Sequence, residues 1–96
     1  MEAKLITDDG RVIPIKPENE VSFVLEEMYN IIKCDVVQVI PIAGTRKILI
    51  IDEEGKLKDK PIVNVLATNL AHEHKAISYG NSIVGNAILC DDTMID

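Results

Sequence analysis

The sequence predicts an α+β domain with a five-stranded mixed or antiparallel sheet and two helices, in the order β-β-α-β-β-α-β. Two observations carry this prediction. β-Branched runs come in pairs joined by short polar turns, and two stretches with apolar residues at helical spacing separate them. The length of 96 residues suits one domain. We place this domain at residues 1–90 and expect a loose, acidic C-terminal tail at residues 91–96.

The first elements are predicted to form a hairpin at the edge of the sheet. Residues 4–7 make a short apolar strand, and residues 11–16 make the return strand after a polar turn. Pro14 has no amide hydrogen to donate to a neighbouring strand. The return strand is therefore expected to lie at an edge.

The first helix is predicted to begin after Asn19, because asparagine is favoured at the N-cap. The apolar side chains that follow recur at helical spacing and form one stripe suited to a core. They are Val21, Val24, Leu25, Met28, Ile31 and Ile32.

A second hairpin and a second helix are predicted next. Residues 36–42 and 47–51 are β-branched runs joined by a short turn that contains Gly44. The helix is expected to start at Pro61, since proline is tolerated in the first turn. Its predicted apolar face consists of Ile62, Val63, Leu66, Ala67 and Leu70.

The last strand is predicted at residues 83–90, after a polar loop at residues 72–82. The strand is apolar almost throughout, which is typical of a central strand covered on both faces. Residues 47–51 also carry apolar side chains on both faces. If both helices cover one face of the sheet, the other face needs its own cover, most commonly a second copy of the chain. We therefore expect a homodimer.

Composition argues against nucleic-acid and membrane partners. The formal charge is −6, from 10 basic and 16 acidic residues, and aromatic residues are only 3% of the chain. Nucleic-acid binding needs clustered cations and stacking surfaces. No apolar run approaches the roughly 20 residues that span a bilayer. The N-terminus lacks the pattern of a signal peptide, so we expect a cytoplasmic location, in the host cell if a phage encodes the protein.

Catalytic chemistry has little support in the sequence. Cys34 or Cys90 could in principle pair with His72 or His74 as a nucleophile and its base. No nucleophile elbow and no glycine-rich oxyanion turn surrounds either cysteine. We interpret both as buried thiols and expect the protein not to be an enzyme.

His72 and His74 are weak candidates for metal ligands. Two residues apart, they share a face only on an extended segment, and a zinc site needs a third and usually a fourth ligand. We expect no metal and no cofactor. The turn around Gly55 lacks the glycines and the Lys-Ser/Thr pair of a phosphate loop, so we interpret it as a turn in which Gly55 takes a positive φ.

A set of uncharged polar residues in the C-terminal half is the candidate ligand- or partner-binding site, because small-ligand pockets use such groups beside apolar surface. The set is Asn64, Thr68, Asn69, Tyr79, Asn81, Ser82 and Asn86. The alternative is structural: Asn64 caps or pins the second helix, and Asn86 bonds the adjacent loop. As a hypothesis, the Asn86 side chain is buried or nearly so and bonds the 79–82 loop or a ligand.

Several short motifs resemble a known family. They are Glu53-Glu54-Gly55-Lys56-Leu57, Pro61, Asn64, Ala67-Thr68 and Ile83-Val84-Gly85-Asn86. In this order they are similar to a DUF3846-like family of small proteins of unknown function from bacteriophages and mobile elements. The resemblance implies a compact α+β fold and a phage or mobile-element origin, and it implies no activity. The chain departs from the family pattern at Asp59-Lys60, at the His72–His74 segment and in its acidic tail.

Two hypotheses of function follow. The first is a non-enzymatic binding or inhibitor protein that acts on a host factor, for example in counter-defence. The alternative is a protein that binds a small molecule or a nucleotide signal at a dimer interface. Only two arginines are present, which disfavours an anionic ligand, although eight lysines remain available.

Overall fold

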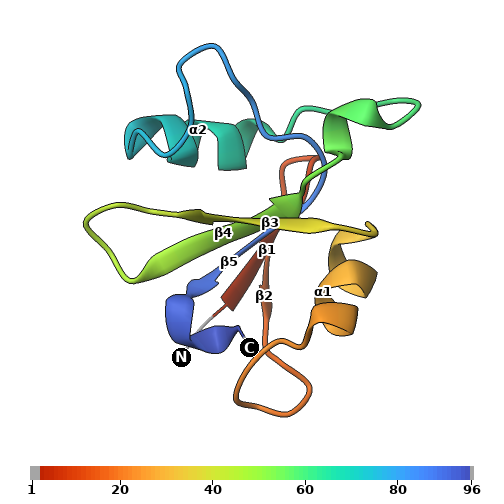
Figure 1. Ribbon diagram of the computed structural model, residues 1–96, viewed down its shortest axis with the longest axis vertical. Helices are drawn as coiled ribbons and strands as arrows, with labels where there is room; N and C mark the ends of the chain where they lie inside the picture. Colours follow the sequence, from red (N-terminus) through yellow and green to blue (C-terminus); the bar gives the residue numbers. More distant parts are fainter. Residues whose placement is uncertain (1–2, 96) are drawn as a thin grey trace.

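A five-stranded antiparallel sheet carries one α-helix on each of its faces (Figure 1). This computed structural model describes residues 3–95. The strands are β1 (Ala3–Ile6), β2 (Val12–Ile15), β3 (Val37–Pro41), β4 (Lys47–Asp52) and β5 (Ala87–Asp91). The α-helices are α1 (Leu25–Ile32) and α2 (Val65–Glu73), and the 3₁₀ helices are η1 (Gly55–Leu57) and η2 (Asp92–Met94). The predicted α+β class is confirmed. Of the two predicted sheet types the antiparallel one is present and the mixed one is not, and the predicted order lacked both 3₁₀ helices.

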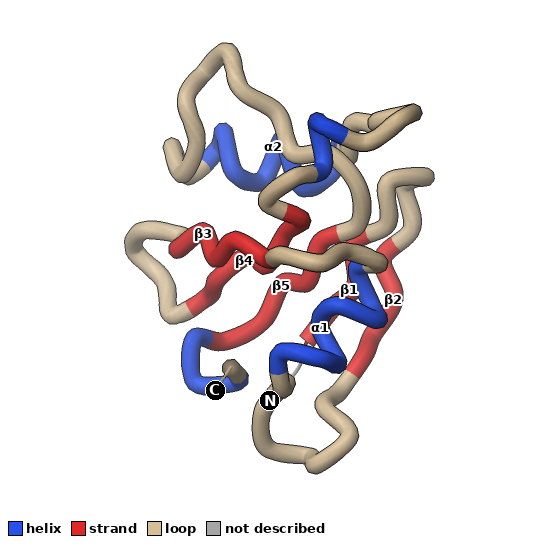
Figure 2. The backbone as a smooth tube through the Cα atoms, turned by 45° about the vertical axis from the view of Figure 1, so that its right-hand side comes forward, coloured by secondary structure: helices blue, strands red, loops and turns tan. Residues whose placement is uncertain are grey.

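The strands lie in the order β2-β1-β5-β4-β3 (Figure 2). Both predicted hairpins are present: Lys4 of β1 is opposite Pro14 of β2, and Val39 of β3 is opposite Ile50 of β4. The strand that contains Pro14 lies at an edge, as predicted. Strand β5 joins the two hairpins by pairing with both β1 and β4, so the central position predicted for the last strand is confirmed.

The last strand begins later than the sequence predicts. Gly85 has a φ of 84°, which turns the chain out of the sheet before β5 starts at Ala87. Upstream of this turn, Val84 forms an isolated antiparallel bridge with Val63. The segment predicted as one strand is therefore divided between a contact with the entrance of α2 and the centre of the sheet.

Each face of the sheet has a core of its own. Phe23, Met28 and Ile32 pack with Ile48 and Ile50 on the α1 face. On the α2 face, the helix residues Ala67 and Ala71 pack with strand and loop residues. These include Leu49, Ile51, Ile83 and Ala87. Full burial of one isoleucine side chain contributes about 1.5–3 kcal/mol, so both layers matter to stability.

This arrangement corrects the premise of the homodimer prediction. The helices cover opposite faces, and residues 48–51 of β4 are at most 8% exposed within one chain. An uncovered sheet face is therefore no reason for a second copy to bind. The alternation of Ile48 and Ile50 with Leu49 and Ile51 reflects two covered faces of a single chain.

Helix α1 starts six residues after its predicted cap. The side-chain oxygen of Asn19 accepts hydrogen bonds from the amides of Val21 and Ser22, each at 2.9 Å. It therefore closes a local turn, a conformation that competes with capping for asparagine. Val24 occupies the N-cap without a side-chain bond. The predicted stripe is wrong at its first three positions, because Val21, Val24 and Leu25 are exposed.

The predicted loose tail is wrong for residues 91–95. Asp91 belongs to β5, and Met94 in η2 is buried on the α1 face. The carbonyl oxygen of Met94 accepts a hydrogen bond from the Phe23 amide at 2.6 Å. Asp96 lies outside the described residues. Across residues 3–95, no helix combines the length and the apolar character needed to cross a membrane.

Candidate functional site

The entrance of α2 is fixed by Asn64. Its side-chain oxygen caps the helix by accepting a hydrogen bond from the Ala67 amide at 3.0 Å. Its side-chain nitrogen donates to the carbonyl oxygens of Ile6 at 2.9 Å and Gly85 at 2.8 Å. Asn64 has no exposed surface, so its polar side-chain groups stabilise the fold. This role agrees with the structural alternative given from the sequence, in which Asn64 caps or pins the second helix.

Thr68 has a similar structural role one turn later. Its hydroxyl oxygen accepts a hydrogen bond from the Ile83 amide at 2.9 Å and lies 3.3 Å from the Ile83 carbonyl oxygen. These contacts hold the segment before β5 against α2. Asn69, the next residue, is exposed on the same helix.

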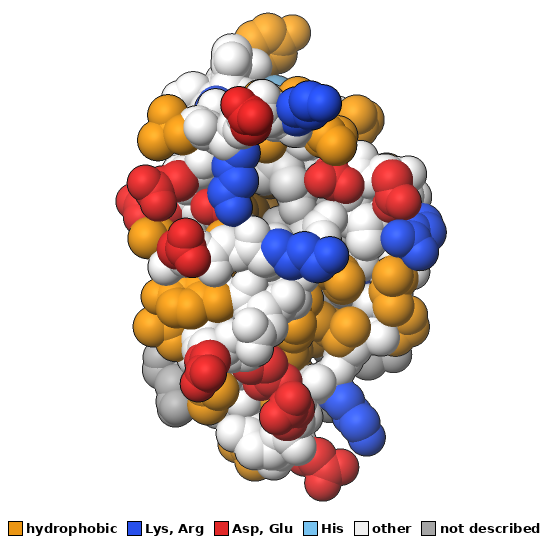
Figure 3. Space-filling view, turned by 90° about the vertical axis from the view of Figure 1, so that its right-hand side faces the viewer, with side chains coloured by type: hydrophobic (Ala, Val, Ile, Leu, Met, Phe, Trp, Pro, Cys, Tyr) orange, Lys and Arg blue, Asp and Glu red, His pale blue; other side chains and the backbone are white. Residues whose placement is uncertain are grey.

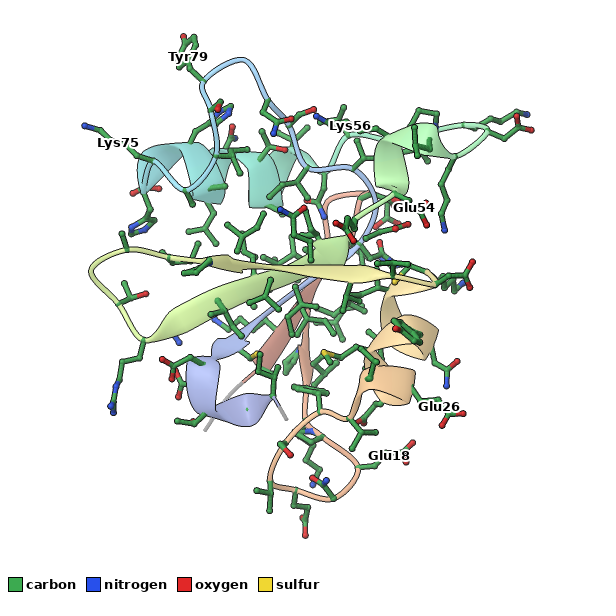
Figure 4. The ribbon with its side chains drawn as sticks, viewed as in Figure 1. Glu18, Glu26, Glu54, Lys56, Lys75 and Tyr79 are labelled. Carbon is green, nitrogen blue, oxygen red and sulfur yellow. The ribbon has the colours of Figure 1, made fainter. Side chains whose placement is uncertain are left out.

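The loop after α2 places Tyr79 at its exposed tip (Figure 4). The Tyr79 ring stacks on His72 with 5.9 Å between the ring centroids, and the Nε2 atom of His72 lies 2.8 Å from the Asn81 carbonyl oxygen. The Asn81 side-chain oxygen accepts hydrogen bonds from the Ser82 amide and from Lys56. The loop is thereby tied both to α2 and to η1.

The two histidines lie at the end of α2. His72 is in the last turn, and His74 is the C-cap residue. Over residues 3–95, no group of three or more His, Cys, Asp or Glu side chains is arranged to hold a metal ion.

Asn86 bonds a different partner from the one expected. Its side-chain oxygen accepts a hydrogen bond from the Asp8 amide at 3.0 Å, so it reaches the β1–β2 turn and not the 79–82 loop. The residue is partly buried. Asn86 directly precedes β5, and Asp8 lies shortly after β1. Because β5 pairs with β1, the two residues lie close together.

Two clefts lie on either side of a close backbone contact between η1 and Val84. A Cβ atom on Gly55 would lie 3.0 Å from the Val84 carbonyl oxygen, so only glycine fits without a shift. Gly55 does not take the positive φ expected of it. The requirement for glycine is instead this close approach. Asp52 and Val84 line both clefts.

The first cleft, named here the β3-side cleft, has a volume of about 200 Å³. Gln38 and Ile40 of β3 form one wall, and Lys56, Asn81 and Ser82 form the other. The second cleft, named here the lysine cleft, has a volume of about 310 Å³. Its polar lining consists of Asp8, Lys33, Asp52, Lys58, Lys60 and Asn86.

The predicted polar set is therefore dispersed. Asn81 and Ser82 line the β3-side cleft, and Asn86 lines the lysine cleft. Asn64 and Thr68 are occupied inside the fold, while Asn69 and Tyr79 are exposed elsewhere. The set does not form one site.

Asp52, which lines both clefts, is held in place by hydrogen bonds on both carboxylate oxygens. Its Oδ1 atom accepts a hydrogen bond from the Glu54 amide at 2.9 Å. Its Oδ2 atom lies 3.1 Å from the Lys58 ammonium, which also donates to the Lys33 carbonyl oxygen at 3.0 Å. The hydrogen bond to Asp52 raises the pKa of Lys58. Lys58 therefore stays charged and links β4 to the end of α1.

The cysteines do not provide an activated nucleophile. Both thiols are buried, as the sequence predicted. Burial raises the pKa of Cys34, and it raises the pKa of Cys90 to about 11. Reactive cysteines have lowered pKa values, because the thiolate is the attacking species.

Residues 57–66 form an exposed apolar surface that the sequence analysis missed. Five large side chains there are between 41% and 80% exposed. They are Leu57, Ile62, Val63, Val65 and Leu66. The sequence placed Ile62, Val63 and Leu66 on the buried face of a helix starting at Pro61, which is wrong because α2 starts at Val65.

Sequence comparison identifies the family. The profile of a domain of unknown function, DUF3846, matches residues 6–95. The chain belongs to the DUF3846 family. Nothing among the curated proteins or the solved structures matches it at a significant level. The family description assigns no activity, so function has to be argued from the surface of the molecule.

Several residues that carried the DUF3846 resemblance hold the fold together. Asn64 and Thr68 fix α2, and Gly55 permits the approach of η1 to Val84. Gly85 provides the turn into β5. These motif residues explain a shared fold. The exposed 57–66 surface overlaps the motifs at Leu57, Pro61 and Asn64, and its other exposed apolar residues lie outside them: Ile62, Val63, Val65 and Leu66.

Proposed function

We propose that this protein is a non-enzymatic binding protein that docks a partner protein through the 57–66 surface. The observation that carries the proposal is the exposure of five large apolar side chains within ten consecutive residues. Single exposed apolar residues are ordinary, but clustered ones rimmed by polar groups are typical of interaction sites.

The two ends of this segment are held near each other. Gly55, just before Leu57, contacts the Val84 backbone, and Val63 forms a bridge with the same residue. The amide of Gly85 also donates to the Ile62 carbonyl oxygen at 2.9 Å. The apolar side chains thus project from a segment that is anchored at both ends, which lowers the entropy lost on binding.

Charge indicates what kind of partner fits. Lys56, Lys58 and Lys60 are exposed within or beside the segment, in a chain whose formal charge is −6. Figure 3 shows the side of the molecule that carries this segment, where hydrophobic side chains lie among lysines and carboxylates. Glu53, Glu54 and Asp59 are exposed beside these lysines, so the matching partner surface is apolar at its centre and carries charged groups of both signs at its rim.

The resemblance to proteins of bacteriophages and mobile elements supports a host protein as this partner. Occupying a functional surface of that protein would inhibit it, as in counter-defence. A cytoplasmic location in the host cell is part of the same proposal.

The test is quantitative capture from a lysate of the encoding cell, followed by titration of the purified partner. The variant is Leu57→Asp combined with Val65→Asp, and the control is Val12→Asp, which alters an exposed valine on β2. We expect the double variant to bind at least about tenfold more weakly, because two apolar contacts are lost and two carboxylates are placed against the apolar centre of the partner surface. Equal affinity of the double variant and wild type would rule out the 57–66 surface.

The alternative function is binding of an anionic small molecule in the lysine cleft. Lys33, Lys58 and Lys60 line this cleft together with Asn86, and that cluster is the observation in its favour. Extraction of purified protein and mass spectrometry would identify a retained ligand. Lys33→Gln with Lys60→Gln should abolish retention, whereas Lys75→Gln, at the far end of α2 (Figure 4), should not. An extract without an anionic compound would remove this alternative.

A further inference from the structure

We propose that β3 pairs antiparallel with β3 of a second copy of the chain, about a two-fold axis at Gln38. The contact joins two five-stranded sheets into one continuous sheet. It uses a surface separate from residues 57–66 and therefore goes beyond the proposed function. It also differs from the homodimer expected from the sequence, which relied on an uncovered sheet face.

The two edge strands differ in how they are protected. Strand β2 carries Pro14 in its interior, and proline removes an amide donor that a further strand would need. Strand β3 has a proline only at its last position, Pro41, and its other residues are uncharged. Natural edge strands usually carry lysine, proline or a bulge against pairing. Between Val37 and Ile40, β3 carries neither a lysine nor a proline.

The hydrogen bonds of β3 reveal which backbone groups point outward. The Ile42 amide donates to the Lys47 carbonyl oxygen, and the Glu53 amide donates to the Val36 carbonyl oxygen, each at 3.0 Å. Hydrogen-bonded residues alternate along an antiparallel strand. Gln38 and Ile40 therefore also bond β4, and the N–H and C=O groups of Val37 and Val39 point away from the sheet.

An axis at Gln38 satisfies these outward groups. Val37 of each copy then lies opposite Val39 of the other, which gives four hydrogen bonds between two pairs of valines. An axis at Val39 would instead place the Val37 carbonyl opposite Pro41, which has no N–H. In the Gln38 register, every outward N–H and C=O group of Val37 and Val39 therefore has a hydrogen-bond partner.

Side chains are compatible with this register. Val36 lies opposite Ile40, Val37 opposite Val39, and Gln38 opposite Gln38, so no like charges face each other. Cross-strand β-branched pairs and amide pairs stabilise such contacts. Val36 and Val39 are among the exposed large apolar residues of the chain.

The pairing also places the second copy beside the β3-side cleft. Gln38 and Ile40 form one wall of that cleft. Gln38 of the second copy lies directly opposite and extends this wall. The contact involves one short strand from each copy, so we expect it to bury less surface than stable interfaces, which bury about 1,200–2,000 Å² in total. We therefore expect a weak dimer, with a dissociation constant on the order of 100 μM.

A register-specific cross-link tests the proposal. Opposite residues in a pair without mutual hydrogen bonds have Cα atoms about 4.5 Å apart, within the range of a disulfide. Gln38→Cys should therefore form an intermolecular disulfide under oxidising conditions. Val39→Cys is the control, since the two Val39 positions are diagonal neighbours roughly 7–8 Å apart. Cys34 and Cys90 are buried and should not compete.

Analytical ultracentrifugation provides the second measurement. The mass of wild type should rise with concentration, and Val39→Lys should weaken association at least about tenfold by placing like charges at the interface. Val12→Lys, at the exposed β2 edge, should match wild type. A wild type that stays monomeric, or a Val39→Cys variant that cross-links as fast as Gln38→Cys, would overturn the proposal. Either result would leave the binding test of the 57–66 surface unaffected.

Discussion

The ammonium of Lys58 lies 3.1 Å from the Oδ2 atom of Asp52, a carboxylate with almost no solvent exposure. This contact connects the last residue of β4 to the segment that carries the exposed apolar surface. Because Lys58 also bonds the end of α1, the pair fixes that segment to both the sheet and a helix.

The first prediction concerns this pair. Asp52→Ala should reduce the free energy of unfolding by about 1–3 kcal/mol, because the Glu54 amide and Lys58 lose their acceptor. Lys58→Met should cost less than about 1 kcal/mol, since the lysine side chain is 46% exposed and solvent screens its ion pair. Urea denaturation of both variants measures the difference. Equal losses would mean that the carboxylate acts only through Lys58.

Asn64→Ala should be among the most destabilising polar substitutions. It removes a helix cap and leaves the Ile6 and Gly85 carbonyls without their donor. We expect a loss of about 2–4 kcal/mol in the free energy of unfolding. Asn69→Ala on the exposed face of α2 is the matched control and should stay within about 0.5 kcal/mol of wild type. Comparable losses for both variants would contradict the role assigned to Asn64.

Gly55→Ala tests the close approach of η1 to Val84. The added methyl group would meet a backbone oxygen at 3.0 Å, and backbone atoms move less easily than a flexible side chain. We expect a loss of about 1–3 kcal/mol, typical of overpacking. Gly80→Ala should be close to neutral, because nothing lies within 4 Å of its Cβ position. Thermal unfolding of both variants provides the measurement, and a neutral Gly55→Ala would contradict the proposed close contact.

The fourth prediction is a loss of stability at alkaline pH. Burial raises the pKa of Cys90 from 9.0 to about 11. A group whose pKa is raised on folding contributes stability that is complete below its unfolded pKa and disappears as pH rises through its folded pKa. The contribution of Cys90 should therefore fall by about 1 kcal/mol between pH 7 and pH 10.

Cys90→Ala should remove this part of the pH dependence, although the smaller side chain lowers stability at pH 7. Urea denaturation at pH 7 and pH 10 separates the two effects, because only the difference between the two pH values reports the thiol. A variant with the same alkaline loss as wild type would show that another group titrates.

Sequence patterns predicted the pairing of strands better than the placement of helices. The hairpins follow from local signals such as Pro14 and the turn between β3 and β4, and the central β5 follows from its apolar composition. Helix starts were less predictable because signals compete. Pro61 and Asn64 can both open a helix, and Asn64 prevails through buried bonds to Ile6 and Gly85 that lie far away in the sequence.

The candidate site was less predictable for the same reason. A structural role was weighed for Asn64 and Asn86, but their partners, like that of Thr68, are backbone groups brought together only by the tertiary fold. The two helices could cover one face of the sheet or both, and periodicity alone does not distinguish these arrangements.

The central position of β5 has a consequence for how the protein is made. The β1–β2 and β3–β4 hairpins are complete early in the sequence, yet they are not neighbours in the sheet, since β5 separates β1 from β4. Until residues 87–91 have left the ribosome, both hairpins expose the strand edges that β5 later fills. Such edges are prone to aggregation, and pairing over a long sequence separation is slow. Folding of the sheet is therefore a late event that depends on its last strand.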